Sequence, residues 1–218
     1  GCGNDLDSRM PMMRRLIVES VLYWMEEFHV DGFRFDLAPI IDRDTFIEIR
    51  DRARARFPGV ILIAEPWGGG KYDLQGFSEI DFSAWNDIFR DGIKGADPRQ
   101  HHGYMLGTWG GRSPEDFGKW MLGSVREKGG PFVSHRHAVN YLESHDGYTL
   151  ADVIRIATGS ARPGQPVGDF ERHICLSPEQ LGISKLAAGL LFGEYCAPLG
   201  WIGEAYVGLL QMTVLPFI

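Results

Sequence analysis

Two patterns of apolar residues alternate along the first third of the chain: helical spacing and short continuous apolar runs. Apolar side chains recur at helical spacing between positions 10 and 28, and a segment with Arg and Asp on one side covers 43–57. Both segments predict helices. The stretches VDGFRFDLAP at 30–39 and VILIA at 60–64 are short and apolar, and they predict strands. With a helix between them and about 30 residues from one strand start to the next, the two strands are predicted to pair in parallel.

The same patterns continue to the end of the chain. They predict a strand at 79–82, helices at 84–94 and 113–123, a strand at 137–143, a helix at 178–192 and a final strand at 213–218. A closed parallel barrel needs eight strands. We therefore expect an α/β fold that forms part of a TIM (β/α)8 barrel, covering roughly strands 4 to 8, with the first three missing. An open doubly wound sheet is the alternative. Because no linker composition interrupts the sequence, residues 1–218 are expected to form one partial domain.

Charge and composition restrict the partners and the compartment. The 218 residues carry a formal net charge of −7 and show no dense basic stripe, which argues against a nucleic-acid partner. The sequence has no run of transmembrane length and no apolar signal region, so we expect a soluble, cytoplasmic protein without a membrane partner. Cys2, Cys175 and Cys196 are scattered, which suggests neither a disulfide framework nor a zinc site.

Two opposite charges interrupt the first predicted strand. Side chains alternate along a strand, so Phe33, Phe35 and Leu37 should share one face while Arg34 and Asp36 share the other. This arrangement fits a barrel strand whose charges reach the barrel mouth. A helix-capping Asp, or a purely structural ion pair with Arg34, fits the stretch equally well.

Further acidic residues follow two other predicted strands. Glu65 comes directly after VILIA, and the strand near 137–143 leads to His145 and Asp146. Neighbouring strands lie about 4.8 Å apart, so Asp36 and Glu65 could approach to the roughly 5–5.5 Å that retaining glycosidases use. Three acids at three strand ends favour a catalytic site over an isolated ion pair.

Three segments give the chain a family resemblance. DGFRFDLA, LIAEPW and NYLESHDG resemble, in their order and surroundings, three motif regions of the alpha-amylase family, glycoside hydrolase family 13. Within this family the chain is most similar to the isoamylase and glycogen-debranching branch, because GCGNDLD, FSAWNDIFRDGIKG and SHDGYTLAD also resemble that branch. The resemblance covers about residues 1–192.

The resemblance implies a role for each matching residue. Asp36 would be the nucleophile that forms a glycosyl-enzyme, Glu65 the general acid and then base, and Asp146 a ligand of sugar hydroxyls that stabilises the transition state. Arg34 would keep Asp36 ionised, and an apolar setting would favour the protonated form of Glu65. His145 resembles the family's sugar-binding histidine. Trp67 could stack on a sugar ring, although a packing role suits it as well.

The implied substrate is an α-glucan such as glycogen or amylopectin, cleaved at α-1,6 branches without a cofactor. A transglycosylase of the same clan and a non-catalytic glucan-binding module are the alternatives. No D-x-x-x-N-H pattern precedes Asp36, so the family's first motif region has no match here. We therefore predict no metal site, and we expect the isolated chain to be inactive. His135 and His137 are interpreted as loop or strand-start residues rather than metal ligands.

Overall fold

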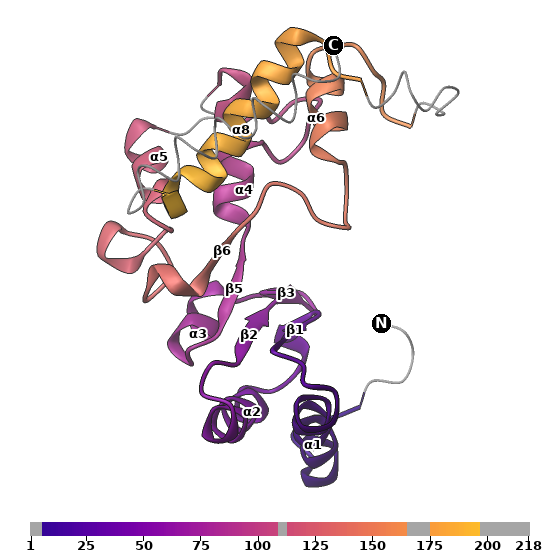
Figure 1. Ribbon diagram of the computed structural model, residues 1–218, viewed down its shortest axis with the longest axis vertical. Helices are drawn as coiled ribbons and strands as arrows, with labels where there is room; N and C mark the ends of the chain where they lie inside the picture. The colour runs from indigo at the N-terminus through magenta and orange to yellow at the C-terminus, as the bar shows by residue number, and fades with distance from the viewer. Residues whose placement is uncertain (1–5, 109–112, 165–174, 197–218) are drawn as a thin grey trace. The chain divides into compact units, whose positions relative to one another are not determined.

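The computed structural model describes residues 6–108, 113–164 and 175–196. The chain forms two compact units, each described by itself below. The first unit contains the residues up to Asn86 together with Gly123–Val139, and the second contains Asp87–Leu122 and the residues from Asn140 onward. Figure 1 labels the helices and strands. None of the described helices is long and apolar enough to cross a lipid bilayer.

A parallel sheet with helices forms the first unit. Its elements are α1 (Pro11–Phe28), β1 (Gly32–Phe35), α2 (Arg43–Arg56), β2 (Ile61–Ala64), β3 (Trp67–Gly68), β4 (Lys71–Tyr72), α3 (Leu74–Glu79) and β5 (Ser83–Asn86). With β6 (Ala138–Asn140), the strand order in the sheet is β1-β2-β5-β6. The β1–β2 and β2–β5 pairs are parallel, with Phe35 opposite Ala64 and Ala64 opposite Ala84. The carboxyl ends of these strands therefore lie at one edge of the sheet.

Aromatic rings fill the core between the sheet and α2. The ring of Phe46, from α2, lies with its centroid 5.2 Å from those of Phe35 and Phe77 and 5.3 Å from that of Phe82, all in edge-to-face geometry. Phe46 and Phe82 are fully buried. Burial of each such ring contributes about 2–3 kcal/mol. The cluster anchors Phe35, the last residue of β1, and so fixes the start of the segment that carries Asp36.

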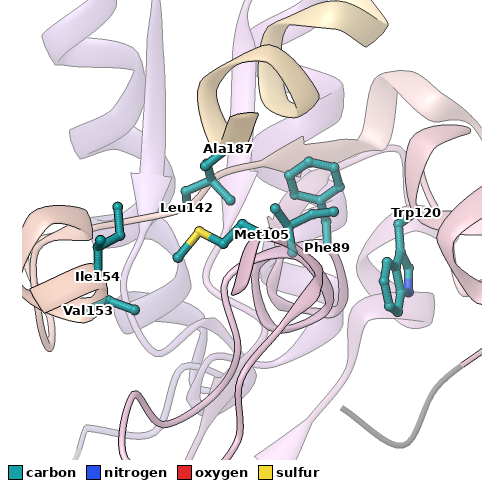
Figure 2. Packing of buried hydrophobic residues seen from close by; sticks show 8 residues of the cluster. Phe89, Met105, Trp120, Leu142, Val153, Ile154 and Ala187 are labelled. Carbon is teal, nitrogen blue, oxygen red and sulfur yellow. The ribbon is translucent and has the colours of Figure 1, made fainter. Parts of the chain in front are cut away.

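The second unit is helical in its described part. It contains α4 (Asp87–Ile93), α5 (Pro114–Met121), α6 (Leu150–Ala157) and α8 (Pro178–Cys196). Figure 2 shows its core, in which Phe89 and Ile93 from α4 pack with Trp120, Ile154 and Ala187 from the other three helices. Ser113 begins α5 with a capping box, because it accepts from the Asp116 amide while the Asp116 carboxylate accepts from the Ser113 amide. The unit therefore has a hydrophobic core of its own.

The helices predicted at 10–28, 43–57, 113–123 and 178–192 are confirmed as α1, α2, α5 and α8, with small differences at their ends. The strand predicted at 79–82 is wrong, because β5 begins at Ser83. Asp81 has a φ of 63° and its amide donates to the Ser78 carbonyl, so the chain turns here and the apolar signal came from the buried ring of Phe82. The helix predicted from 84 consequently begins only at Asp87.

Two further expectations differ from the structure. The predicted strand 137–143 is shorter, since β6 covers only Ala138–Asn140. The antiparallel hairpin of β3 and β4, which pairs Trp67 with Tyr72, was not expected from the glycine-rich sequence between them. The strand predicted at 213–218 lies outside the described residues.

Candidate active site

The parallel pairing of β1 and β2 brings Asp36 and Glu65 to the same end of the sheet. Asp36 follows β1 and Glu65 follows β2, each as the first residue after its strand. The Glu65 amide donates to the Phe35 carbonyl at 2.9 Å, and the Ala38 amide donates to the Glu65 carbonyl at 3.1 Å. These two bonds continue the ladder beyond the strands. The backbones that carry the two carboxylates are therefore held side by side.

A single guanidinium bridges the two carboxylates. Arg34 Nη1 lies 2.7 Å from Asp36 Oδ1, and Arg34 Nη2 lies 3.1 Å from Glu65 Oε1. The expectation that Arg34 and Asp36 lie together on one face is confirmed, and Glu65 joins them. Because the planar guanidinium offers several donors in fixed directions, it sets the spacing of both acids as well as balancing their charge.

Burial distinguishes the two acids. The Glu65 side chain is 4% exposed, whereas that of Asp36 is 66% exposed. Glu65 Oε2 also accepts a hydrogen bond of 2.5 Å from the Leu37 amide. Glu65 Oε1 thus takes part in an ion pair, while Oε2 accepts a hydrogen bond. An open carboxylate beside an enclosed one provides two acids with separate roles.

Leu37 leaves the strand geometry that the sequence pattern predicts. Its φ of 44° lies in the left-handed region, which is rare for a leucine, and its side chain is 41% exposed. The prediction that Leu37 shares the apolar face of Phe33 and Phe35 is therefore wrong. The turn aims the Leu37 amide at Glu65, and this hydrogen bond offsets part of the strain in the backbone.

Two tryptophans lie near this end of the sheet. Trp67 is half-buried in β3, and the next residue, Gly68, packs so closely that a Cβ there would lie 2.9 Å from Leu37 Cβ. Trp85, in β5, places its ring centroid 5.8 Å from Arg34 Cζ. This cation–π contact holds the bridging guanidinium from a third strand. Trp85 was not among the residues predicted for the site, although it lies in FSAWN, part of a segment that resembles the debranching branch.

His145 and Asp146 lie in the second unit, in the loop that connects β6 to α6. Their side chains are 67% and 73% exposed, with His145 Nε2 3.6 Å from Asp146 Oδ2. Glu143 accepts a short hydrogen bond from the Leu150 amide at the start of α6. Gly147 has a positive φ of 81°, which lets the loop turn between Glu143 and Leu150. Within the first unit, Arg34 thus forms ion pairs with both Asp36 and Glu65. That these residues share a site with Asp146 stays a prediction.

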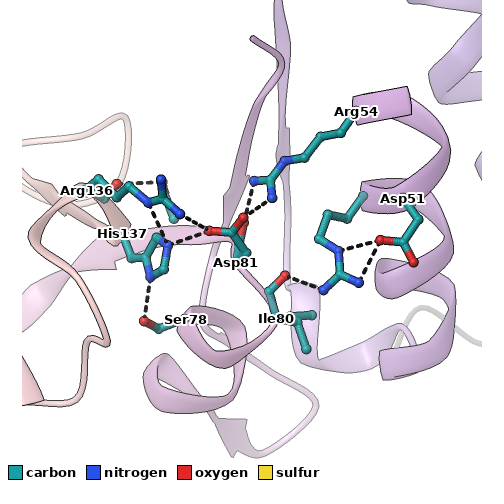
Figure 3. Close-up of polar contacts among 9 residues, drawn as sticks. Asp51, Arg54, Ser78, Ile80, Asp81, Arg136 and His137 are labelled. Atoms are coloured by element: carbon teal, nitrogen blue, oxygen red, sulfur yellow. Dashed lines mark hydrogen bonds and ion pairs between the residues drawn. The ribbon is translucent and has the colours of Figure 1, made fainter. Parts of the chain in front are cut away.

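A second polar cluster in the first unit surrounds Asp81, as Figure 3 shows. Asp81 Oδ1 accepts from Arg136 Nη2 at 2.9 Å and lies 2.7 Å from His137 Nε2, while Oδ2 pairs with Arg54. His137 Nδ1 lies 2.9 Å from Ser78 Oγ.

The order Ser, His, Asp in this cluster resembles a catalytic triad, but Ser78 is only 2% exposed. Its Oγ also accepts from the Val133 amide at 2.7 Å. Because Ser78 is enclosed, we interpret the cluster as structural: it ties α2, α3 and the segment before β6 together. His137 ends the 3-10 turn His135–His137 directly before β6, in agreement with the loop or strand-entry position expected from the sequence.

The described residues contain no group of three His, Cys, Asp or Glu side chains placed to hold a metal ion. What the first unit does contain is an acidic pair bridged by an arginine, at the carboxyl ends of adjacent parallel strands. In α/β proteins this edge is where ligands bind and catalytic side chains gather. The fold and the site therefore define an α/β protein equipped for acid–base or nucleophilic chemistry.

Comparison with known proteins identifies the family. The chain is 35% identical to a Bacillus subtilis pullulanase over 170 residues, covering 72% of this chain and 23% of that protein. It is 37% identical to the chloroplastic isoamylase 3 of Oryza sativa subsp. japonica over 168 residues, covering 71% and 20% respectively. A GlgX homolog of Haemophilus influenzae is 33% identical over 165 residues, covering 71% and 23%. No family model matches the sequence.

Solved structures give the same result. The pullulanase of Paenibacillus barengoltzii in complex with maltohexaose and alpha-cyclodextrin matches with a TM-score of 0.70 and 29% identity, over 87% of this chain and 29% of that one. The pullulanase of Bacillus acidopullulyticus matches with a TM-score of 0.71 and 28% identity, over 88% and 22%. Over about 70% of its length the chain is thus homologous to pullulanases, isoamylases and GlgX debranching enzymes, which form a branch of the alpha-amylase family. It spans between a fifth and a quarter of the length of the curated relatives described above.

Proposed function

We propose that this chain carries the catalytic residues of a retaining glycoside hydrolase that cleaves α-1,6 branch linkages in glycogen or a related α-glucan. The observation that supports this most directly is the bridge from Arg34 to both Asp36 and Glu65. The homologues are named pullulanase, isoamylase and glycogen debranching enzyme, and one related structure holds maltohexaose.

The two acids divide the reaction between them. Asp36, open on one side, attacks the anomeric carbon, and the bond from that carbon to the leaving oxygen breaks as Glu65 donates its proton to that oxygen. In the second half-reaction Glu65 takes a proton from water, and the resulting hydroxide displaces Asp36 from the anomeric carbon. Two displacements at one carbon leave the α configuration unchanged. We assign Asp146 to the sugar hydroxyls of the distorted residue, together with His145.

The same proposal includes the fold. β1, β2, β5 and β6 would be strands 4 to 7 of a (β/α)8 barrel, with three preceding strands supplied from outside these residues. The strand order follows the chain order, as in a barrel, whereas a doubly wound sheet reverses it. Large apolar side chains are also half-exposed at Trp24, Phe28 and Ile61, where further elements of a barrel would pack.

Trapping of the covalent intermediate tests the nucleophile. A fluorinated glucosyl fluoride should label a protein extended at the N-terminus to supply the three preceding strands, and peptide mass spectrometry should locate the label on Asp36. The variant Asp36→Asn should not be labelled, because an amide does not attack the anomeric carbon. Asp51→Asn, an exposed acid of α2 that pairs with its neighbour Arg50, is the matched control and should be labelled normally. Normal turnover by Asp36→Asn would refute the assignment.

Product analysis tests the reaction class. Glycogen should release linear oligosaccharides whose new reducing ends are initially α by NMR, whereas inverted products would contradict the mechanism. Glu65→Gln should lose most activity on glycogen but recover part of it on substrates with an activated leaving group, which need no proton. Transfer to added maltose instead of water would identify a transglycosylase. Glucan binding without turnover, in a protein extended at the N-terminus to restore the missing strands, would favour a binding module.

A further inference from the structure

The second unit contains a pocket of about 400 Å³ that includes Asp146 among its lining residues. One wall comes from the end of α4 and the loop that follows it, and the other from the loop before α6. The polar side chains that line it are Arg90, Lys94, Asp97, Arg99, Ser144 and Asp146, together with Tyr148. The roles proposed above use only Asp146 of this set.

Lys94 is the one cation of this pocket whose charged group has no hydrogen bond or ion pair within the described part of the chain. Burial lowers the pKa of Lys94, and the nearby charge of Arg90 lowers it further. Asp91 and Glu143 act on Lys94 only through longer-range attraction. A half-buried ammonium with unused donors is costly unless a ligand or water accepts from it.

The other two cations of the pocket already have partners. Arg90 Nε donates to Asp91 at 2.6 Å, and Arg90 Nη1 donates to the Tyr141 hydroxyl at 2.7 Å. Arg99 pairs with Asp97 at 2.6 Å, and these bonds hold the pKa of Asp97 far below its usual range. These pairs fix the walls, and among the described residues Lys94 is the cation of the pocket with every donor unused.

Backbone contacts make this wall rigid. Gly95 has a φ of 98°, and a Cβ there would lie 2.1 Å from the His101 carbonyl. The Gly103 amide donates to the Lys94 carbonyl, and the His101 amide donates to the Asp97 carbonyl at 2.9 Å. The loop that carries Lys94 is therefore closed on itself. Preformed pockets of this kind bind small ligands with little loss of entropy.

The pocket combines an ammonium donor, the Ser144 hydroxyl, the exposed Asp146 carboxylate and the partly exposed ring of Tyr148. Alternating donors and acceptors beside an aromatic ring match the hydroxyls and apolar face of a sugar. We propose that this pocket binds a glucosyl unit of the α-glucan, with Lys94 donating to its hydroxyls and Asp146 accepting from them. This inference takes its substrate class from the proposed function. It adds Lys94 as a binding residue that takes no part in bond breaking.

Direct binding tests the proposal without requiring turnover. Maltotriose is titrated into the 218-residue chain and its variants, with detection by NMR and calorimetry. Lys94→Met should weaken maltotriose binding about tenfold, the effect of losing one charged hydrogen-bond donor. Lys119→Met is the matched control, because Lys119 is a partly exposed lysine of the same unit, paired with Asp116 away from the pocket. It should bind like the unaltered chain.

Equal binding by Lys94→Met and the unaltered chain, or no binding of maltotriose at all, would overturn the proposal. Lys94-dependent binding of inorganic phosphate in place of maltotriose would show an anion site and would also overturn the proposal. If maltotriose binding depends on Lys94 but the N-terminally extended protein hydrolyses no glucan, the sugar pocket stands and the proposed hydrolysis fails. In an active enzyme, Lys94→Met should raise KM about tenfold with little change in kcat.

Discussion

The Asp36–Glu65 end of the first unit and the His145–Asp146 loop of the second each contain acidic residues but hold them by different contacts. Glu65 bonds to the Leu37 amide and to Arg34, residues 28 and 31 positions away in the sequence. The bonds described for the 143–150 loop span no more than seven positions. Long-range contacts enclose one acid and leave its partner open, whereas local contacts leave both side chains of the loop in solvent. Substitutions in the two regions should therefore differ in their effect on stability.

The strongest test of this difference is Arg34→Met. Loss of the guanidinium leaves the enclosed Glu65 without its cation and releases Asp36 from its position. In the N-terminally extended protein we expect debranching activity to fall about 1,000-fold and the free energy of unfolding to fall by about 3 kcal/mol, measured by glycogen debranching and by urea unfolding. Arg126→Met is the control, because it removes a half-exposed arginine of the same unit from its pair with Glu79. Its stability should change by less than about 1 kcal/mol.

Asp146→Asn should separate activity from stability. An amide accepts hydrogen bonds from sugar hydroxyls less strongly than a carboxylate and carries no charge to stabilise the transition state. We expect a loss of activity of about 100-fold. Because the side chain is 73% exposed, urea unfolding should shift by less than about 0.5 kcal/mol. A large loss of stability in this variant would show that the loop is held by more than its local contacts.

Gly68→Ala tests whether the Leu37 turn positions Glu65. A Cβ at this site would lie 2.9 Å from Leu37 Cβ and 3.0 Å from its carbonyl oxygen, so Leu37 must move and its amide with it. A shift of this kind should lower kcat about tenfold. Gly70→Ala is the matched control, because Gly70 also has a positive φ but has nothing within 4 Å of an added Cβ. Equal losses in both variants would mean that backbone strain, rather than the contact with Leu37, causes the effect.

The smallest expected effect concerns acid stability of the first unit. Burial raises the pKa of Asp81, but hydrogen bonds from His137 and Arg54 and the charges of Arg54 and Arg136 outweigh it and lower the pKa below the ordinary 3.8. A lowered folded-state pKa gives stability that is present above about pH 4 and is lost as the pH falls through the folded value. Asp81→Asn should cost about 1–2 kcal/mol at pH 7 and flatten this acid loss in urea unfolding. An unchanged acid slope would contradict the role of the cluster.

Local patterns in the sequence determined much of the fold and part of the site. Helical spacing identified α1 and α2, and apolar runs identified β1 and β2, because each pattern depends on neighbours within one element. The same reasoning placed Asp36 and Glu65 at strand ends and Arg34 on the face of Asp36. The family motifs then supplied the roles that are proposed for these residues. Local propensity failed at Asp81, where a turn replaced the expected strand.

Tertiary structure alone decided how these residues meet. Arg34 bridges two acids instead of one because β2 pairs in register with β1, and no pattern within either segment contains that register. Leu37 adopts a left-handed turn because Glu65, 28 positions away, accepts from its amide. Trp85 covers Arg34 from a third strand. The sequence alone determined the elements and the acids at their ends, because both follow from neighbouring residues, whereas pairing across long separations set the burial, direction and spacing of those acids.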